Sequence, residues 1–176
     1  KILDKSDKDV LKRYEKYIQD FELMAELATI LKNRRLEQGY LNLDIPESKI
    51  ELDKNGKAIN VGKYETSFSN EIIEQFMLSA NETIAQKFYW IEAPFIYRVH
   101  EDPDLDKVKD LNNFLFNFGL KIKIANEKIY PLEVSKILEE IKGKEEEKVI
   151  STLILRTLKV AKYEAENKGH FGIASK

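Results

Sequence analysis

The feature that most constrains the fold is the segment 67–88 (SFSNEIIEQFMLSANETIAQKF), in which apolar side chains recur at the spacing of an α-helix. That period excludes a β-strand, where apolar and polar side chains alternate. The serines at its start, Ser67 first, suit a helix N-terminus, because short polar side chains accept bonds from its free N–H groups. We expect the buried face to consist of Ile73, Phe76, Met77, Ala80, Ile84 and Phe88. Glu74 and Asn81 share a polar stripe beside it, which is either a solvated face or the edge of a binding site.

A second long helix is predicted near the start of the chain. Ser6 or Asp7 can cap it, and Gly39 supplies a stop after about Gln38. Between these ends the apolar residues follow the helical period: Leu11, Tyr14, Ile18, Phe21, Ala25, Ala28 and Leu31. The pattern therefore predicts one long N-terminal helix.

Shorter elements complete the pattern and define the fold class. We expect a β-hairpin within 42–61 with Asn55-Gly56 as its turn, and further strands over 93–99 and 120–124. One helix is expected to start at Asp102-Pro103 and to run to Gly119, and a short one to cover 131–142. The last helix has an apolar core stripe: Ile150, Leu153, Ile154, Thr157, Leu158 and Ala161. Such a mixture predicts an α+β, helix-rich fold in one unit.

Length and composition limit the class of protein further. The length of 176 residues favours one domain that can bury a hydrophobic core. The chain contains 43% hydrophobic and 34% charged residues, a composition typical of a globular protein. The absence of cysteine excludes disulfides, thiolate zinc sites and a catalytic cysteine, and it fits a cytoplasmic location. No apolar run is long enough to cross a bilayer and no signal peptide opens the chain, so we expect no membrane partner. Because it starts with Lys1 and stops at "GHFGIASK", we expect a piece of a longer protein.

Neither the acidic run nor the histidines predict a metal site. Residues 102–106 (DPDLD) resemble the start of a calcium loop, but Lys107 stands where such a loop needs glycine and Asn113 where it needs glutamate. The spacing of the only two histidines, His100 and His170, fits no standard metal motif. An acidic helix N-terminus and two structural histidines explain these residues better.

Arg156, Lys159 and Tyr163 share one face if the last helix continues through them. Such a face could position a phosphate backbone beside an aromatic ring, although a basic solvated face is the commoner meaning. The net charge of −2 gives no global basic footprint for nucleic acid. Composition and spacing alone therefore name no reaction.

Four segments carry a resemblance to a known family: LATILKNRRLEQGYLNLDIPESKIELDKNGK, YETSFSNEIIEQFMLSANETIAQ, PFIYRVHEDPDLDKV and LRTLKVAKYEAENKGHFGIAS. In this order, and over nearly the whole chain, they resemble the central part of the RNB catalytic domain of the ribonuclease II and ribonuclease R family. The resemblance implies that residues 1–176 are an internal fragment of a single RNB domain.

The resemblance also implies an activity. Members of that family are Mg²⁺-dependent exoribonucleases that degrade single-stranded RNA processively from the 3′ end to 5′-nucleoside monophosphates, and DNA is not an expected partner. Metal ions activate water and neutralise charge on the phosphoryl and leaving oxygens. The family's metal-binding aspartates and its catalytic arginine lie outside the matched region. We therefore expect no catalytic residue and no metal ligand here, and negligible RNA hydrolysis by this chain alone.

Substrate-binding candidates follow from the same resemblance. Glu74 matches a glutamate that lies along the RNA path and helps to recognise the ribose, whose 2′-OH a carboxylate can bind. Leu43 stands where some members carry an aromatic side chain that packs on the terminal base, and leucine can still make an apolar contact there. Arg98, Arg156 and Lys159 are weaker candidates for contact with the RNA backbone.

Several residues depart from the family's pattern. Asn70 and Glu71 stand where histidine and arginine are frequent, and Gln75 replaces a second glutamate. With Leu43, these departures support an alternative, a degenerate RNB-like protein that binds RNA or a partner without catalysis. A helical scaffold unrelated to RNA remains only if the resemblance is coincidental. Asn81 matches the motif's asparagine, for which we expect a structural role.

Overall fold

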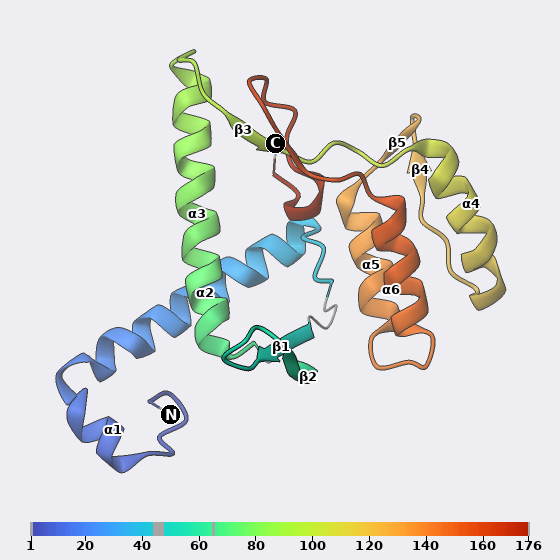
Figure 1. The fold of residues 1–176 in the computed structure, drawn as a ribbon. Helices are drawn as coiled ribbons and strands as arrows, with labels where there is room; N and C mark the ends of the chain where they lie inside the picture. Colours follow the sequence, from blue (N-terminus) through green and yellow to red (C-terminus); the bar gives the residue numbers. More distant parts are fainter. Residues whose placement is uncertain (1, 44–47, 65, 176) are drawn as a thin grey trace.

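The computed structural model describes residues 2–43, 48–64 and 66–175 (Figure 1). Its helices are α1 (Lys8–Arg13), α2 (Ile18–Gln38), α3 (Phe68–Trp90), α4 (Leu105–Leu115), α5 (Pro131–Ile141) and α6 (Glu147–Thr157). Its strands β1 (Ser48–Leu52), β2 (Ala58–Lys63), β3 (Tyr97–Val99), β4 (Ile124–Ala125), β5 (Lys128–Ile129) and β6 (Lys162–Glu164) pair as the two-stranded antiparallel sheets β1–β2, β3–β6 and β4–β5. The α+β, helix-rich fold expected from the sequence is confirmed.

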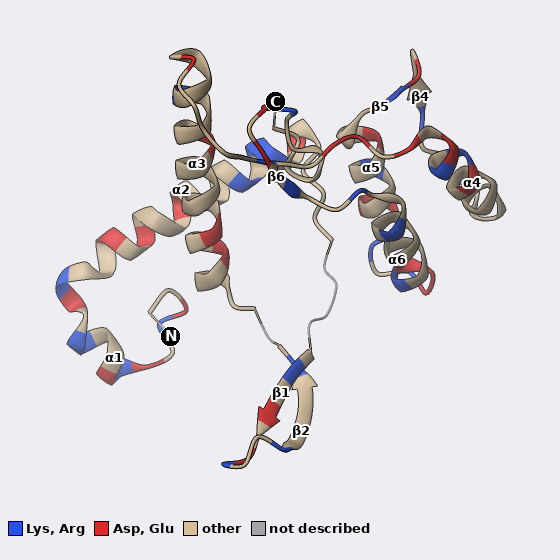
Figure 2. Ribbon diagram, turned by 45° about the horizontal axis from the view of Figure 1, so that its top comes forward, with Lys and Arg blue, Asp and Glu red and all other residues tan. Residues whose placement is uncertain are grey.

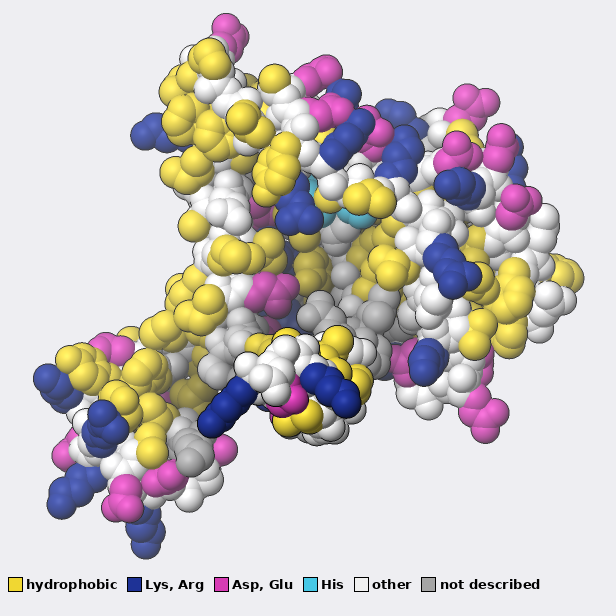
Figure 3. Space-filling model, viewed as in Figure 1, with side chains coloured by type: hydrophobic (Ala, Val, Ile, Leu, Met, Phe, Trp, Pro, Cys, Tyr) yellow, Lys and Arg dark blue, Asp and Glu magenta, His cyan; other side chains and the backbone are white. Residues whose placement is uncertain are grey.

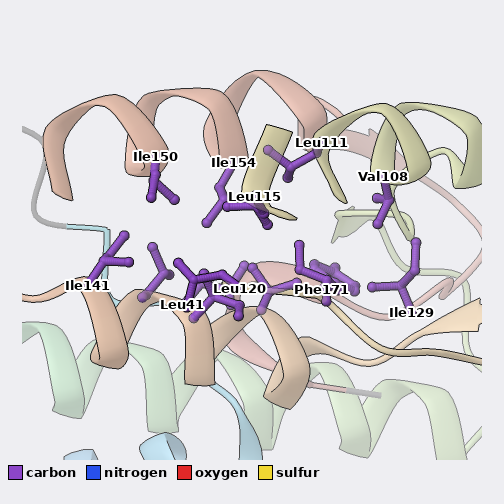
Figure 4. Close-up of a cluster of buried hydrophobic side chains, with 14 residues drawn as sticks. Leu41, Val108, Leu111, Leu115, Leu120, Ile129, Ile141, Ile150, Ile154 and Phe171 are labelled. Atoms are coloured by element: carbon purple, nitrogen blue, oxygen red, sulfur yellow. The ribbon is translucent and has the colours of Figure 1, made fainter. Parts of the chain in front are cut away.

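The hydrophobic core lies between α4, α5 and α6 (Figure 4). Each helix turns one apolar stripe inward, and the side chains that are almost fully buried include Val108 and Leu115 of α4, Val134 and Ile141 of α5, and Ile150 and Ile154 of α6. Leu41, just after α2, and Phe171, near the end of the chain, reach the same cluster. Since burial of one such side chain is worth about 1.5–3 kcal/mol, this cluster stabilises the molecule and anchors both segments to it.

Local signals place the helices of the core. The Oδ1 atom of Asp104 accepts a hydrogen bond from the N–H of Asp106 at 2.9 Å, which caps α4. Asp104, and not Asp102 as predicted, is therefore the capping residue. Pro131 occupies the first turn of α5, where its missing N–H is of no consequence.

Helices α2 and α3 cross outside this core and contact each other (Figure 1). Gly39 ends α2 in the left-handed conformation, with φ 99°, as predicted. At the start of α3, the backbone N–H of Ser67 donates to Oδ1 of Asn70 at 3.0 Å in a capping box. The end of α2 and the start of α3 thus follow from local chemistry.

The contact between these two helices is built around one buried guanidinium. Arg35 of α2 is only 5% exposed. Three of its nitrogens donate to side chains of α3: Nε to Gln75 at 3.1 Å, Nη1 to Glu82 at 2.6 Å and Nη2 to Ser79 at 3.1 Å. These partners lie on one helix face, and the planar fork of arginine reaches all of them at once.

The buried face of α3 was predicted wrongly. Its buried residues are Ile72 and Gln75, whereas Ile73 and Met77 are 60% and 51% exposed. The reason is electrostatic: the buried charge of Arg35 needs hydrogen-bonding partners, so the face of α3 with Gln75, Ser79 and Glu82 is turned inward. Figure 3 accordingly shows apolar side chains gathered on the surface over α3.

Two further expectations need correction. The predicted N-terminal helix is interrupted at Tyr14, which has φ −110° and ψ 17°, and no residue of α1 is buried that would hold it in line with α2. Of the predicted strand over 120–124, only the last residue belongs to a strand, β4. The side chain of Asn112 occupies both backbone groups of Ile122: its Oδ1 accepts from the N–H of Ile122 at 2.8 Å, and its Nδ2 donates to the carbonyl of Ile122 at 2.9 Å.

The β1–β2 hairpin turns at Asn55-Gly56 as predicted, and every residue of its strands is exposed. Figure 2 shows it projecting away from the helices. Residues 44–47, which belong to the expected extended segment, lie outside the described residues. In the described part of the chain, no helix combines the length and the apolar character needed to cross a membrane.

Replacement of Arg35 by Leu should destabilise the fold strongly. It would leave Gln75 buried and Glu82 partly buried without their partner, which costs about 3–5 kcal/mol for a buried ion pair. The matched control is Lys32→Leu on the same helix. Lys32 binds Glu71 at 2.7 Å, but both side chains are 29% exposed, so about 0–1 kcal/mol should be lost. Urea unfolding of the two variants measures the difference, and equal losses would contradict the role given to Arg35.

Candidate ribose-binding site

Glu74 lies on α3 immediately before Gln75, at the edge of the face that contacts α2, and is half-buried. Its Oε1 atom accepts a hydrogen bond from the hydroxyl of Tyr40 at 3.0 Å. Burial, and then the negative charge of Glu74, raise the pKa of Tyr40 to about 12. Tyr40 is therefore a protonated donor at neutral pH, and the carboxylate is bound through one oxygen.

Tyr40 is fixed by the residues around it. Its N–H donates to the carbonyl of Arg35 at 2.9 Å, and its own carbonyl accepts from the hydroxyl of Ser135 on α5 at 3.2 Å. Gly39, before it, packs so closely on α5 that a Cβ atom would lie 2.4 Å from the backbone nitrogen of Leu132. Only glycine suits that approach and its positive φ. The ring of Tyr40 thus connects the core to Glu74.

Leu43 lies three positions further along the same segment. It is half-buried, its N–H donates to the carbonyl of Leu41 at 3.0 Å, and its side chain packs against the hydrophobic core. The segment with Tyr40 and Leu43 is therefore anchored by the core on one side and by Glu74 on the other. The contact of Leu43 with a base stays a prediction.

The predicted face of Arg156, Lys159 and Tyr163 does not exist, because α6 ends at Thr157 and the next residue is extended. Tyr163 belongs to β6, where it pairs in register with Arg98 of β3. Backbone pairing between distant segments has overridden the local helical pattern. Residues opposite each other on a ladder share one face, so the exposed Arg98 and the 71% exposed Tyr163 lie side by side.

Lys159 lies in a network of opposite charges rather than on a free basic face. Its Nζ atom contacts Glu101 at 3.2 Å, and Lys162 and Lys168 contact the same carboxylate at 3.6 and 3.7 Å. The hydrogen bond and charge of Lys159 lower the pKa of Glu101. Figure 2 shows these mixed charges around β6. Arg156 is exposed in the last turn of α6.

Two histidines join β3 to the end of the chain. The rings of His100 and His170 pack edge to face with centroids 5.1 Å apart, and Nδ1 of His100 accepts from the N–H of Gly172 at 3.2 Å. Nε2 of His100 and Nδ1 of His170 are buried without a hydrogen-bond partner among the described residues. Burial, then the neighbouring His100 and Arg98, lower the pKa of His170 to about 4, and burial also lowers the pKa of His100. Both rings are neutral at pH 7.

Within the described residues, no group of three or more His, Cys, Asp or Glu side chains is placed to bind a metal ion. The acidic run that begins at Asp102 provides the cap of α4 through Asp104. Among these residues, the chemistry of the candidate site is therefore that of a carboxylate with a fixed orientation.

Sequence reasoning missed Tyr40 and Arg35. The helical period did contain a signal for Arg35, which lies on the same face of α2 as Ala28 and Leu31 and is therefore directed toward whatever that face contacts. No local signal pointed to Tyr40, because its hydroxyl meets a residue on another helix.

Comparison with known proteins identifies the class. The family model of the RNB domain matches residues 2–176. The chain belongs to the RNB domain family.

Within this family, the relatives and solved structures to which the chain is similar are ribonucleases R. The chain is 37% identical over 163 residues to ribonuclease R of Aquifex aeolicus and 36% identical over 169 residues to ribonuclease R 1 of Lactococcus lactis, matches that cover 93% and 96% of this chain. Its fold is similar to the apo form of Mycoplasma genitalium RNase R, with a TM-score of 0.85 and 25% identity over 92% of this chain. The same values hold for that enzyme in complex with ribose-methylated single-stranded RNA. The chain spans only 23% and 21% of the lengths of the two relatives and 25% of the solved chain.

The histidine pair predicts a pH dependence of stability. A histidine whose pKa falls from 6.5 to about 4 on folding binds fewer protons in the folded than in the unfolded state between these values. The free energy of unfolding is therefore highest above about pH 6.5, where His170 is neutral in both states, and it decreases as the pH falls from 6.5 toward 4. Thermal unfolding between pH 7.5 and 5 should show a falling Tm for the wild type and a weaker fall for His170→Gln. Glu101 and Glu164, whose pKa values are lowered, contribute little in this window. Parallel curves for both proteins would exclude the assignment.

Proposed function

We propose that this chain is the central part of the catalytic domain of a 3′→5′ exoribonuclease that hydrolyses single-stranded RNA to 5′-nucleoside monophosphates. The observation that carries the proposal is the similarity, over 92% of the chain, to an RNase R in complex with single-stranded RNA. In this proposal Glu74 contacts the ribose, Leu43 touches a base, and Arg98 and Arg156 contact phosphates. Lys159 is a weaker phosphate contact, because Glu101 already binds it.

The proposal places this chain inside a larger domain. Exposed apolar stripes on two helices support this: Leu23, Leu27 and Ile30 of α2 are 56%, 49% and 56% exposed, and Ile73 and Met77 of α3 are exposed as well. Contiguous apolar surface of this kind marks a face that another surface covers. In a protein several times longer than this chain, the remaining polypeptide would cover it.

Metal-assisted hydrolysis fits the proposed reaction, with Mg²⁺ as the ion. A divalent cation generates a nucleophile from water and stabilises the charge that develops on the phosphate. In this proposal the metal ligands belong to residues beyond this chain, and the described residues contain no candidate metal cluster. The residues of this chain would bind and orient the RNA. We place the protein in the cytoplasm.

The departures from the family's pattern do not favour a degenerate protein. Glu71 binds Lys32, Gln75 binds Arg35, and Asn70 caps α3. Each of them has a partner in the fold: Glu71 and Gln75 contribute to the α2–α3 contact, and Asn70 stabilises the start of α3. This leaves Leu43 as the single departure at a proposed substrate contact.

The full-length protein should degrade 5′-labelled oligoadenylate in Mg²⁺ and release AMP, whereas residues 1–176 alone should not. Glu74→Ala should weaken RNA hydrolysis, measured as kcat/KM, by roughly 10- to 100-fold, because a hydrogen bond to a charged group is worth about 1.5–3 kcal/mol. Glu140→Ala removes an exposed carboxylate of α5 as the matched control and should behave as wild type. Failure of the full-length protein to degrade RNA would refute the catalytic proposal, and equal activity of the two variants would refute the role of Glu74.

A further inference from the structure

We propose that Tyr40 is a positioning residue for ribose recognition. In this account its hydroxyl fixes Oε1 of Glu74, so that Oε2 is left to accept a hydrogen bond from the 2′-OH of RNA. The inference rests on the proposed function of Glu74 and adds the residue through which its orientation is set.

Tyr40 and Glu74 are joined by a hydrogen bond to one carboxylate oxygen. The hydroxyl of Tyr40 lies 3.0 Å from Oε1 of Glu74, in a half-buried position. A glutamate at the edge of a helix face otherwise has several rotamers, and it loses that freedom when it binds a ligand. A hydrogen bond present before the ligand arrives removes part of that loss, so the carboxylate binds more tightly without a new contact to RNA.

The donor of this hydrogen bond, Tyr40, is itself held in place by two helices. The backbone of Tyr40 is bonded to Arg35 on one side and to Ser135 on the other, and the close packing of Gly39 on Leu132 fixes the preceding residue. The ring is therefore placed by α2 and α5 together. A group that orients a ligand-binding side chain must itself be fixed, and Tyr40 meets that condition.

The hydrogen bond between Tyr40 and Glu74 runs in one direction, from the hydroxyl to the carboxylate. Because its pKa is raised to about 12, the hydroxyl of Tyr40 stays protonated at neutral pH and donates to the carboxylate. Oε1 of Glu74 is then occupied, whereas Oε2 has no hydrogen-bond partner among the residues that the structure describes. As part of a carboxylate, Oε2 can only accept. A ribose can donate from its 2′-OH, whereas a deoxyribose cannot. Tyr40 should therefore affect the binding of RNA and leave the binding of DNA unchanged.

The test measures binding of matched ten-nucleotide oligoriboadenylate and oligodeoxyadenylate to the full-length protein. Divalent cations are removed with EDTA so that the RNA is not cleaved, and fluorescence anisotropy gives the two Kd values. The proteins are the wild type, Tyr40→Phe, Glu74→Ala and the double variant. Tyr130→Phe, at an exposed tyrosine before α5, is the matched control, and thermal unfolding verifies that all of them are folded.

Tyr40→Phe should weaken RNA binding about 5- to 10-fold and change DNA binding less than twofold, with no effect once Glu74 is already alanine. An equal loss for RNA and DNA, or a loss that persists in the double variant, would show a merely structural role and overturn the inference. If Glu74→Ala lowers the preference for RNA and Tyr40→Phe does not, the inference alone fails. If Glu74→Ala leaves that preference intact, the proposed role of Glu74 fails first.

Discussion

The arrangement of this molecule depends on the burial of one positive charge. A guanidinium removed from water is costly unless its donors are satisfied, and Arg35 satisfies three of them on α3. Its partners at Gln75, Ser79 and Glu82 fix both the rotation and the axial position of α3 against α2. A helix positioned by apolar contacts alone would turn its other face inward. Ile73 and Met77 accordingly lie on the face of α3 that is turned away from α2.

The candidate site is a product of that rotation. Glu74 precedes Gln75, so the bond between Gln75 and Arg35 places Glu74 at the edge of the helix contact, where the hydroxyl of Tyr40 reaches it. Tyr40 in turn belongs to the segment that the hydrophobic core anchors through Leu41. The orientation of the Glu74 carboxylate thus depends on two separate parts of the structure: the hydrogen bonds of the buried Arg35, which set the rotation of α3, and the apolar core, which holds the segment with Tyr40. This explains how a single glutamate on an otherwise open surface acquires a defined orientation.

Local signals in the sequence predicted much of the fold but not the orientation of its parts. The helix start at Ser67, the stop at Gly39 and the hairpin turn at Asn55-Gly56 depend on neighbours in the chain, and the structure contains all three. The buried face of α3 depends on Arg35 of another helix, and the strand β6 depends on its pairing with β3. The helical period of the sequence contains neither kind of information, so it predicted both features wrongly. The family resemblance pointed to Glu74. The hydrogen bond from Tyr40 that orients Glu74 joins residues far apart in the chain, so neither the sequence pattern nor the resemblance predicted it.

The most direct test of this account is a structure of the full-length protein with unmodified single-stranded RNA, obtained without divalent cations so that the strand is not cleaved. The account predicts Oε2 of Glu74 within hydrogen-bond distance of a ribose 2′-OH, with Tyr40 still bound to Oε1 and Arg35 still buried between α2 and α3. An RNA path that avoids Glu74, or a Glu74 side chain that leaves Tyr40 to reach the ribose, would contradict it.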